Sequence, residues 1–244
     1  MVDSPRNRFH NSLQSMTRSE PSPAVYLVDD DASVRRGLRR LLVAAGHVVE
    51  TFASAIEFLD HARSQDVCGC VVLDIRMPGL SGLDLQQELK VVAPALPIVF
   101  ITGHGDVPSS VRALKDGAVD FLIKPVDEKD LLSVLARSIA LNQEARALDA
   151  EMRELRRRAD SLTPREREVM GLVVQGKLNK QIAGELGTVE KTIKVHRARV
   201  IRKMEVGSLA ELVRAAEKLG IYPHKTGVAT PRSKAAFVPP IPSA

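Results

Sequence analysis

Residues 71–82 read VVLDIRMPGLSG, and this stretch decides the fold. Val71, Val72 and Leu73 form an apolar run that ends on the carboxylate of Asp74. A Met-Pro-Gly turn signal follows it directly. Apolar residues on both faces indicate a strand inside a parallel sheet that helices cover on both sides. Open sheets of this kind carry their chemistry at the carboxyl ends of the strands, which is where Asp74 stands.

Polar side chains also end three further apolar runs, 25–31, 97–102 and 120–125: Asp29, Asp30 and Asp31, then Thr102, then Lys124. Because the carboxyl ends of parallel strands meet at one edge, we expect these groups to converge with Asp74. Crowded acid groups repel one another, and a hard divalent cation with oxygen ligands relieves that repulsion. Each residue alone is ordinary, since aspartates cap helices and lysines occur at strand ends. Together they predict a functional site.

This constellation resembles the receiver domain of two-component response regulators. Residues 101–125, ITGHGDVPSSVRALKDGAVDFLIKP, resemble the FixJ branch of that family. The resemblance implies that Asp74 takes a phosphoryl group from the phosphohistidine of a sensor histidine kinase. It also implies a Mg²⁺ cofactor, for which the expected ligands are Asp29, Asp30, Asp74 and the backbone carbonyl of Arg76.

The same resemblance assigns roles to four other residues. Lys124 would balance charge on the phosphoryl oxygens, and Thr102 would hydrogen-bond one of them. Phe121 would rotate into the space that Thr102 leaves, which is a two-state packing change. Val111 and Lys115 resemble positions at which receivers pair, so we expect a homodimer on phosphorylation.

Composition limits the remaining possibilities. The 244 residues suffice for two modest domains, and with no Trp and two Tyr their cores must be aliphatic. Cys68 and Cys70 form neither a zinc set nor a disulfide framework, and we interpret both as core thiols in a reducing cytoplasm. No apolar run approaches the ~20 residues that a membrane span needs. The sequence therefore predicts a cytoplasmic protein without a membrane partner.

Charge is distributed unevenly along the chain. Lys, Arg, Asp and Glu give residues 24–141 a net charge of −4 and residues 142–221 a net charge of +5. An acidic first half and a basic second half suit a metal site followed by a module that binds a polyanion.

Strand and helix patterns alternate through residues 24–141, which predicts an α/β domain. We expect a flavodoxin-like (CheY-like) receiver with five parallel strands in the order 2-1-3-4-5. Residues 1–23 and 222–244 have compositions typical of disordered segments.

A helical linker is predicted over residues 142–160. Apolar residues recur at alternating spacings of four and three from Leu141 to Leu162, which forms a heptad seam. The seam fits either pairing in a dimer or packing against the linker's own domain.

An all-α module of four helices is predicted over residues 161–221. Thr163, Pro164 and Glu166 form a capping box with proline at the first helical position. Two short helices separated by a glycine turn, the second of them basic, indicate a helix-turn-helix.

The third helix of this module has an inner and an outer side at 100° per residue. Ile193, His196, Val200 and Met204 face inward, with His196 expected to be packed and hydrogen-bonded. The residues predicted to bind DNA lie on the outer side, on its flanks, or at the start of the preceding helix: Asn179, Lys180, Lys191, Lys194, Val195, Arg197, Ala198, Arg199 and Arg202. Lysines suit guanine edges and apolar groups suit thymine methyls. Arg197, Arg199 and Lys203 are expected at phosphates.

Residues 162–204 closely resemble the LuxR/NarL-type DNA-binding domain, in which the third helix reads DNA and the fourth contributes to dimerisation. The chain departs from that pattern at Val189, where relatives usually have a Ser that caps the recognition helix. Either Thr188 caps this helix one residue early, or about 1 kcal/mol of capping is missing.

These features predict a transcription factor that a histidine kinase controls, with promoter DNA and RNA polymerase as further partners. The protein would catalyse only its own aspartyl phosphorylation and dephosphorylation. A phosphatase of the haloacid dehalogenase kind needs a second Asp two residues after the nucleophile, where this chain has Arg76. The third alternative is a DNA-binding protein whose receiver serves only for dimerisation or docking.

Overall fold

A computed structural model describes residues 22–103 and 107–221 of the chain. It contains two compact units, which divide after Asp149. Disorder was predicted for residues 1–23 and 222–244. Of these, only residues 22 and 23 belong to the described part. No helix in the described ranges has the length and apolar character that crossing a membrane requires.

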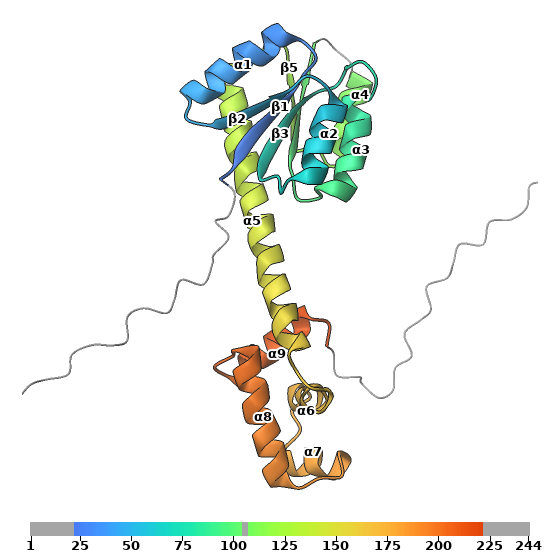
Figure 1. Cartoon of the computed structure of the whole chain (residues 1–244), viewed down its shortest axis with the longest axis vertical. Coiled ribbons are helices and arrows are strands. Elements are labelled where there is room, and N and C mark those ends of the chain that lie inside the picture. The colour runs from blue at the N-terminus through green and yellow to red at the C-terminus, as the bar shows by residue number, and fades with distance from the viewer. Residues whose placement is uncertain (1–21, 104–106, 222–244) are drawn as a thin grey trace, which may run out of the picture. The chain divides into compact units, whose positions relative to one another are not determined.

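The first unit is built on a five-stranded parallel sheet (Figure 1). Its strands are β1 (Ala24–Val28), β2 (Val48–Phe52), β3 (Gly69–Asp74), β4 (Ile98–Thr102) and β5 (Asp120–Ile123). Their order is β2-β1-β3-β4-β5, which confirms the flavodoxin-like prediction. β1, β3 and β4 are buried along their whole length, as continuous apolar runs require.

Helices cover both faces of this sheet (Figure 1). They are α1 (Ala32–Ala44), α2 (Ala55–Ser64), α3 (Gly82–Val92), α4 (Val107–Lys115) and α5 (Glu128–Asp160). α1 and α5 pack on one face, where Leu42 and Leu135 are fully buried. α2, α3 and α4 pack on the other, around Phe58, Leu85 and Ala113. Cys68 and Cys70 are buried free thiols, as predicted.

The second unit is helical. It contains α6 (Pro164–Val174), α7 (Asn179–Glu185), α8 (Glu190–Met204) and α9 (Leu209–Lys218). The capping box at Thr163 and Glu166 is formed in both directions. Met170, Ile182, Ile193 and Met204 make a fully buried aliphatic core. The four predicted helices are therefore present.

Helix α5 contributes to both units. Asn142, near its middle, is buried in the first unit, whereas Ala159 near its end is buried in the core of the second. Leu162, just beyond the helix, joins that second core. Leu141 and Leu148, in the first half of the predicted seam, are 45% and 59% exposed. The second half of the seam thus packs within its own unit, which was one of the two alternatives.

Candidate functional site

The register of the sheet brings the predicted polar residues to one edge. Val28 pairs with Leu73, so Asp29 and Asp74 follow at the same level of adjacent strands. Thr102 pairs with Ile123, and the Lys124 N–H donates to the Thr102 carbonyl at 2.8 Å. Residues from four separate strand ends therefore lie at one edge of the sheet, although any two of them are at least 22 positions apart along the chain.

Lys124 is the centre of this group. Its ammonium donates to Asp29 Oδ2 at 2.6 Å and to Asp74 Oδ1 at 3.0 Å. Asp29 and Asp74 are 1% and 7% exposed, so both ion pairs lie largely out of water. The Lys124–Pro125 peptide is cis. Asp30 is exposed, and its carboxylate makes no hydrogen bond or ion pair with the described residues.

Burial raises the pKa of the Asp74 carboxyl, and the hydrogen bond from Lys124 opposes that rise. The nearby charge of Asp29 raises the pKa further. Burial lowers the pKa of Lys124, but its hydrogen bonds to Asp29 and Asp74 outweigh this effect and raise it overall. Burial is the largest of these effects, so the pKa of Asp74 stays raised although Lys124 contacts it.

The loop after Asp74 is held against it. The Arg76 N–H donates to Asp74 Oδ2 at 3.2 Å. The Gly82 N–H donates to the Ile75 carbonyl at 3.0 Å, and a Cβ on Gly82 would lie 2.2 Å from the Asp74 carbonyl oxygen. Only glycine fits such an approach. The second glycine of the opening stretch therefore closes this loop over the base of Asp74.

The donor set fits Mg²⁺ chemically, since it consists of carboxylates and a backbone carbonyl. In the described residues no three His, Cys, Asp or Glu side chains are already gathered around one point for a metal. The predicted ligands would be Asp30, Asp74 and the Arg76 carbonyl, with Asp29 beside them.

Thr102 is buried, and its hydroxyl makes no hydrogen bond with the described residues. Phe121 is half-buried and packs against the core that contains Phe100. Val111 is 44% exposed on α4, and Lys115 is also exposed there. These positions are compatible with the predicted switch and pairing roles but do not test them.

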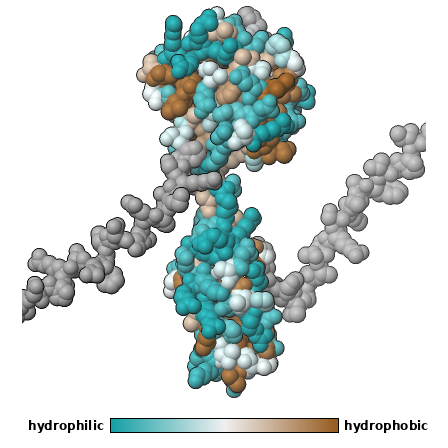
Figure 2. Space-filling model, in the orientation of Figure 1, coloured by the Kyte–Doolittle hydropathy of each residue, from teal (hydrophilic) through white to brown (hydrophobic). Residues whose placement is uncertain are grey.

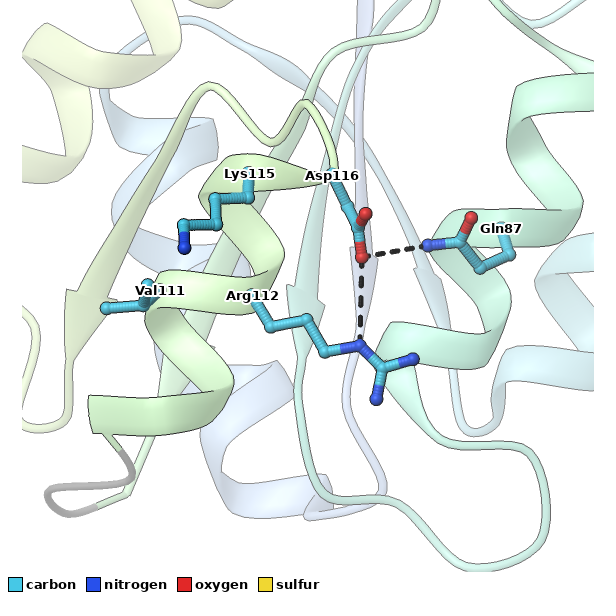
Figure 3. A pocket seen from close by; sticks show the side chains of 5 residues that line it. All are labelled: Gln87, Val111, Arg112, Lys115 and Asp116. Atoms are coloured by element: carbon cyan, nitrogen blue, oxygen red, sulfur yellow. Dashed lines mark hydrogen bonds and ion pairs between the residues drawn. The ribbon is translucent and has the colours of Figure 1, made fainter. Parts of the chain in front are cut away.

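The C-terminal end of α4 is tied to α3. Figure 3 shows Arg112 and Gln87 pointing toward Asp116, while Val111 and Lys115 point away. Gln87 donates to Asp116 Oδ2 at 3.1 Å, and the Arg112 guanidinium lies 3.8 Å from the same oxygen. The buried side chain of Gln86 donates to the Ala113 carbonyl at 3.0 Å, but its own Oε1 has no partner among the described residues. A group of polar contacts thus holds the helix that follows Thr102.

The second unit presents a basic outer face on α8. Most predicted DNA contacts are exposed: Lys180, Lys191, Lys194, Val195, Ala198, Arg199 and Arg202. Ile193, Val200 and Met204 are buried on the opposite side, as the helical angle predicts. Figure 2 shows hydrophilic residues over most of the visible face of this unit. Exposed cations around an exposed valine suit a DNA groove.

Two predicted DNA contacts are paired with each other. Arg197 Nη1 donates to Asn179 Oδ1 at 2.8 Å, and this bond joins α8 to the start of α7. Both side chains are half-buried. In the free protein the two side chains therefore link α7 and α8.

Lys203 was expected to contact phosphate, and in the free protein it is paired within its own unit. Its ammonium donates to the buried carboxylate of Glu166 at 2.6 Å and to the Ser161 carbonyl at 2.9 Å. The helical angle indicated on which side of α8 Lys203 lies, but not that its side chain contacts a buried carboxylate. His196 differs in part from its prediction, because it packs inward but its buried Nδ1 has no hydrogen-bond partner among the described residues.

Helix α8 begins without a side-chain cap. Its N-cap residue is Val189, which is 64% exposed, and Thr188 does not cap the helix in its place. Of the two alternatives, the missing cap is the one that the structure shows.

Sequence reasoning missed three contacts near these sites. Arg35 donates to the Asp29 carbonyl, Asn142 bonds to two strand-entry segments, and Glu166 pairs with Lys203. Arg35 follows the acidic loop by one helical turn, which is a detectable signal. The other two contacts join segments distant in sequence and leave no local pattern.

Comparison with known proteins agrees with this geometry. Residues 25–136 match the family model of the response regulator receiver domain, and residues 160–216 match that of the bacterial regulatory proteins of the luxR family. The chain belongs to the response regulators. Nodulation protein W of Bradyrhizobium diazoefficiens is 44% identical, over 86% of this chain and 92% of that protein.

Two further similarities extend over both domains of this response regulator. The transcriptional regulatory protein FixJ of the same organism is 43% identical, over 81% of this chain and 96% of FixJ. A solved structure of the response regulator StyR has a TM-score of 0.76 and 50% identity, over 81% of this chain and 100% of StyR. The predicted combination of a receiver with a LuxR-type domain is therefore confirmed.

Proposed function

We propose that phosphorylation of Asp74 controls binding of this response regulator to promoter DNA. The observation that carries the proposal is Lys124, whose ammonium bridges the buried carboxylates of Asp29 and Asp74. Such a cation beside a nucleophilic carboxylate suits phosphoryl transfer, in which charge stabilisation and positioning do most of the work.

In the proposed reaction an Asp74 oxygen attacks the phosphorus of a kinase phosphohistidine. The P–O bond forms as the P–N bond breaks, and the imidazole nitrogen keeps the electron pair and takes up a proton. Lys124 would pair with the phosphoryl oxygens, and the Thr102 hydroxyl would donate to one of them. Mg²⁺ at Asp30, Asp74 and the Arg76 carbonyl would supply the remaining positive charge.

The signal would leave the site through α4 and β5. Thr102 ends β4, and Phe121 stands on the neighbouring strand β5. α4 and β5 expose Val111, Leu114 and Ile123, at 44%, 39% and 56%. Exposed apolar side chains of this kind suit a surface that pairs with a second copy. Dimers would then place two α8 helices on DNA, where RNA polymerase is a further partner.

The proposal has a direct test in Asp74→Asn. Asn keeps the shape of the side chain but loses the nucleophilic charge, so acetyl phosphate with Mg²⁺ should label the wild type and not the variant. Asp31→Asn is the matched control, because Asp31 is an exposed acid of the same edge that caps α1. Stoichiometric labelling of the Asp74 variant would contradict the assignment. Multiple turnovers of phosphate release would instead favour a phosphatase.

A further inference from the structure

Asp29 is fixed at every polar atom it has. Oδ2 accepts from Lys124, and Oδ1 accepts from the Asp31 N–H at 2.8 Å. The Asp29 N–H donates to the Phe52 carbonyl at 3.3 Å, and its carbonyl accepts from Arg35 Nη1 at 2.6 Å. Three of these contacts come from strand ends or the adjacent turn. The fourth comes from a guanidinium on α1.

Arg35 closes a small ring around the acidic loop. Asp31 caps α1 by accepting from the Ser33 N–H at 2.7 Å, and Arg35 reaches back from the first turn to the peptide that joins Asp29 to Asp30. The neighbouring Arg36 is exposed and donates only to Ser33 Oγ among the described residues. Two adjacent arginines therefore differ in one respect that matters here, contact with the Asp29–Asp30 peptide.

We propose that Arg35 is a positioning residue for phosphoryl transfer. It holds the peptide from which the Asp30 carboxylate projects, and it keeps Asp29 where that side chain holds Lys124 beside Asp74. The inference rests on the proposed function, since it concerns the same Mg²⁺ and phosphoryl site. Arg35 itself makes no hydrogen bond to the Asp74 side chain, so it acts through Asp29.

Charge and positioning predict opposite effects, which makes the inference testable. Removing a cation near a Mg²⁺ site raises the affinity for Mg²⁺ by Coulomb's law alone. Releasing a group that orients metal ligands lowers the affinity, by about 10-fold or more. Lysine keeps the charge of arginine but lacks its planar fork of donors. Arg35→Lys therefore isolates the loss of positioning.

The experiment compares wild type, Arg35→Lys, Arg35→Met and the control Arg36→Met in the full chain. Calorimetry gives the Mg²⁺ affinity, acetyl phosphate gives the phosphorylation rate without a kinase, and urea unfolding gives the stability. Both Arg35 variants should bind Mg²⁺ about 10-fold more weakly and phosphorylate more slowly. Arg36→Met should behave as wild type.

Unchanged or tighter Mg²⁺ binding by the Arg35 variants would overturn the inference. A loss of stability with wild-type Mg²⁺ affinity would also overturn it. Arg35 would then only stabilise the packing of α1 on β1 and would not position the Mg²⁺ ligands. A wild type that neither binds Mg²⁺ nor becomes labelled would overturn the proposed function itself. The two failures are therefore distinguishable.

Discussion

Glu166 and Lys203 show how one buried contact decides the role of a surface cation. Glu166 is 2% exposed, and the hydrogen bond from Lys203, aided by the Thr163 N–H, lowers the pKa of its carboxyl to about 2. A folded-state pKa below the ordinary 4.5 means that the pair stabilises the folded state fully above that value. The stabilisation is lost as the pH falls from 4.5 toward about 2.

Glu166→Gln should therefore make the second unit less sensitive to acid between those two pH values. Gln cannot titrate, so the variant is less stable near neutrality but loses less on acidification. Hydrogen exchange of α6 and α8 amides in the full chain, followed from pH 4.5 downward, measures how steeply the stability of the second unit falls with pH. Glu168→Gln removes an exposed carboxylate of the same helix and is the control. Parallel slopes for Glu166→Gln and wild type would contradict the prediction.

Val189→Ser should stabilise the second unit by about 1 kcal/mol, because a serine at the N-cap accepts from an N–H that no side chain now satisfies. Denaturant unfolding monitored at α8 amides gives the difference in free energy of unfolding. Val195→Ser, on the exposed outer side of the same helix, is the control and should give no gain. A Val189 variant no more stable than this control would show that water already satisfies the free amides.

At the scale of residues, sequence predicted what lies at strand ends and on helix faces. Asp29, Asp74 and Lys124 meet as predicted, because a parallel sheet fixes which ends coincide. The partner of Lys203 was not predictable, because a long side chain reaches several groups and only the fold selects one.

At the scale of elements, the strands and most helices agree with the sequence pattern to within a few residues. α5 is the exception, since the second half of its heptad seam joins a core whereas Leu141 and Leu148 in the first half are exposed. Heptad spacing reports a buried face but not which surface buries it. The same pattern would arise from a paired coiled coil, so the sequence pattern by itself does not separate the two alternatives.

Asn142 on α5 makes two side-chain hydrogen bonds to the backbone of the first unit. Its Oδ1 accepts from the Gly69 N–H at 2.8 Å, and its Nδ2 donates to the Ala95 carbonyl at 2.6 Å. The side chain is 1% exposed, so these backbone groups lose both partners if it is removed. Gly69 begins β3, and the segment with Ala95 precedes β4. One amide thus ties α5 to the entry of the two strands that end on Asp74 and Thr102.

Asn142→Ala should destabilise the first unit by about 1–3 kcal/mol, the usual cost of leaving buried polar groups unpaired. Urea unfolding followed at β3 amides measures the change. The control is Gln143→Ala, because Gln143 is the next residue and is exposed. Equal stability of the two variants would mean that water replaces the Asn142 side chain at both backbone groups.

At the scale of the whole molecule, the signal must pass from an acidic unit to a basic one. Dimerisation through the first unit would transmit this signal without any fixed arrangement between the two units of one chain. Two linked DNA-binding units gain affinity by effective concentration, without any new contact within either unit. Phosphorylation that promotes pairing would therefore raise promoter affinity even if α8 itself stayed unchanged.

Val111→Asp tests this route. A charge on the exposed face of α4 should oppose pairing, so beryllofluoride should raise the dimer fraction of wild type but not of the variant. Val91→Asp is the matched control, since Val91 is an 84% exposed valine on α3 and not on α4 or β5. Sedimentation gives the dimer fraction, and titration of promoter DNA gives the affinity. Val111→Asp should keep labelling at Asp74 while losing the gain in both measurements. If wild type has the same mass before and after beryllofluoride, or if the two aspartate variants behave alike, pairing through α4 does not carry the signal.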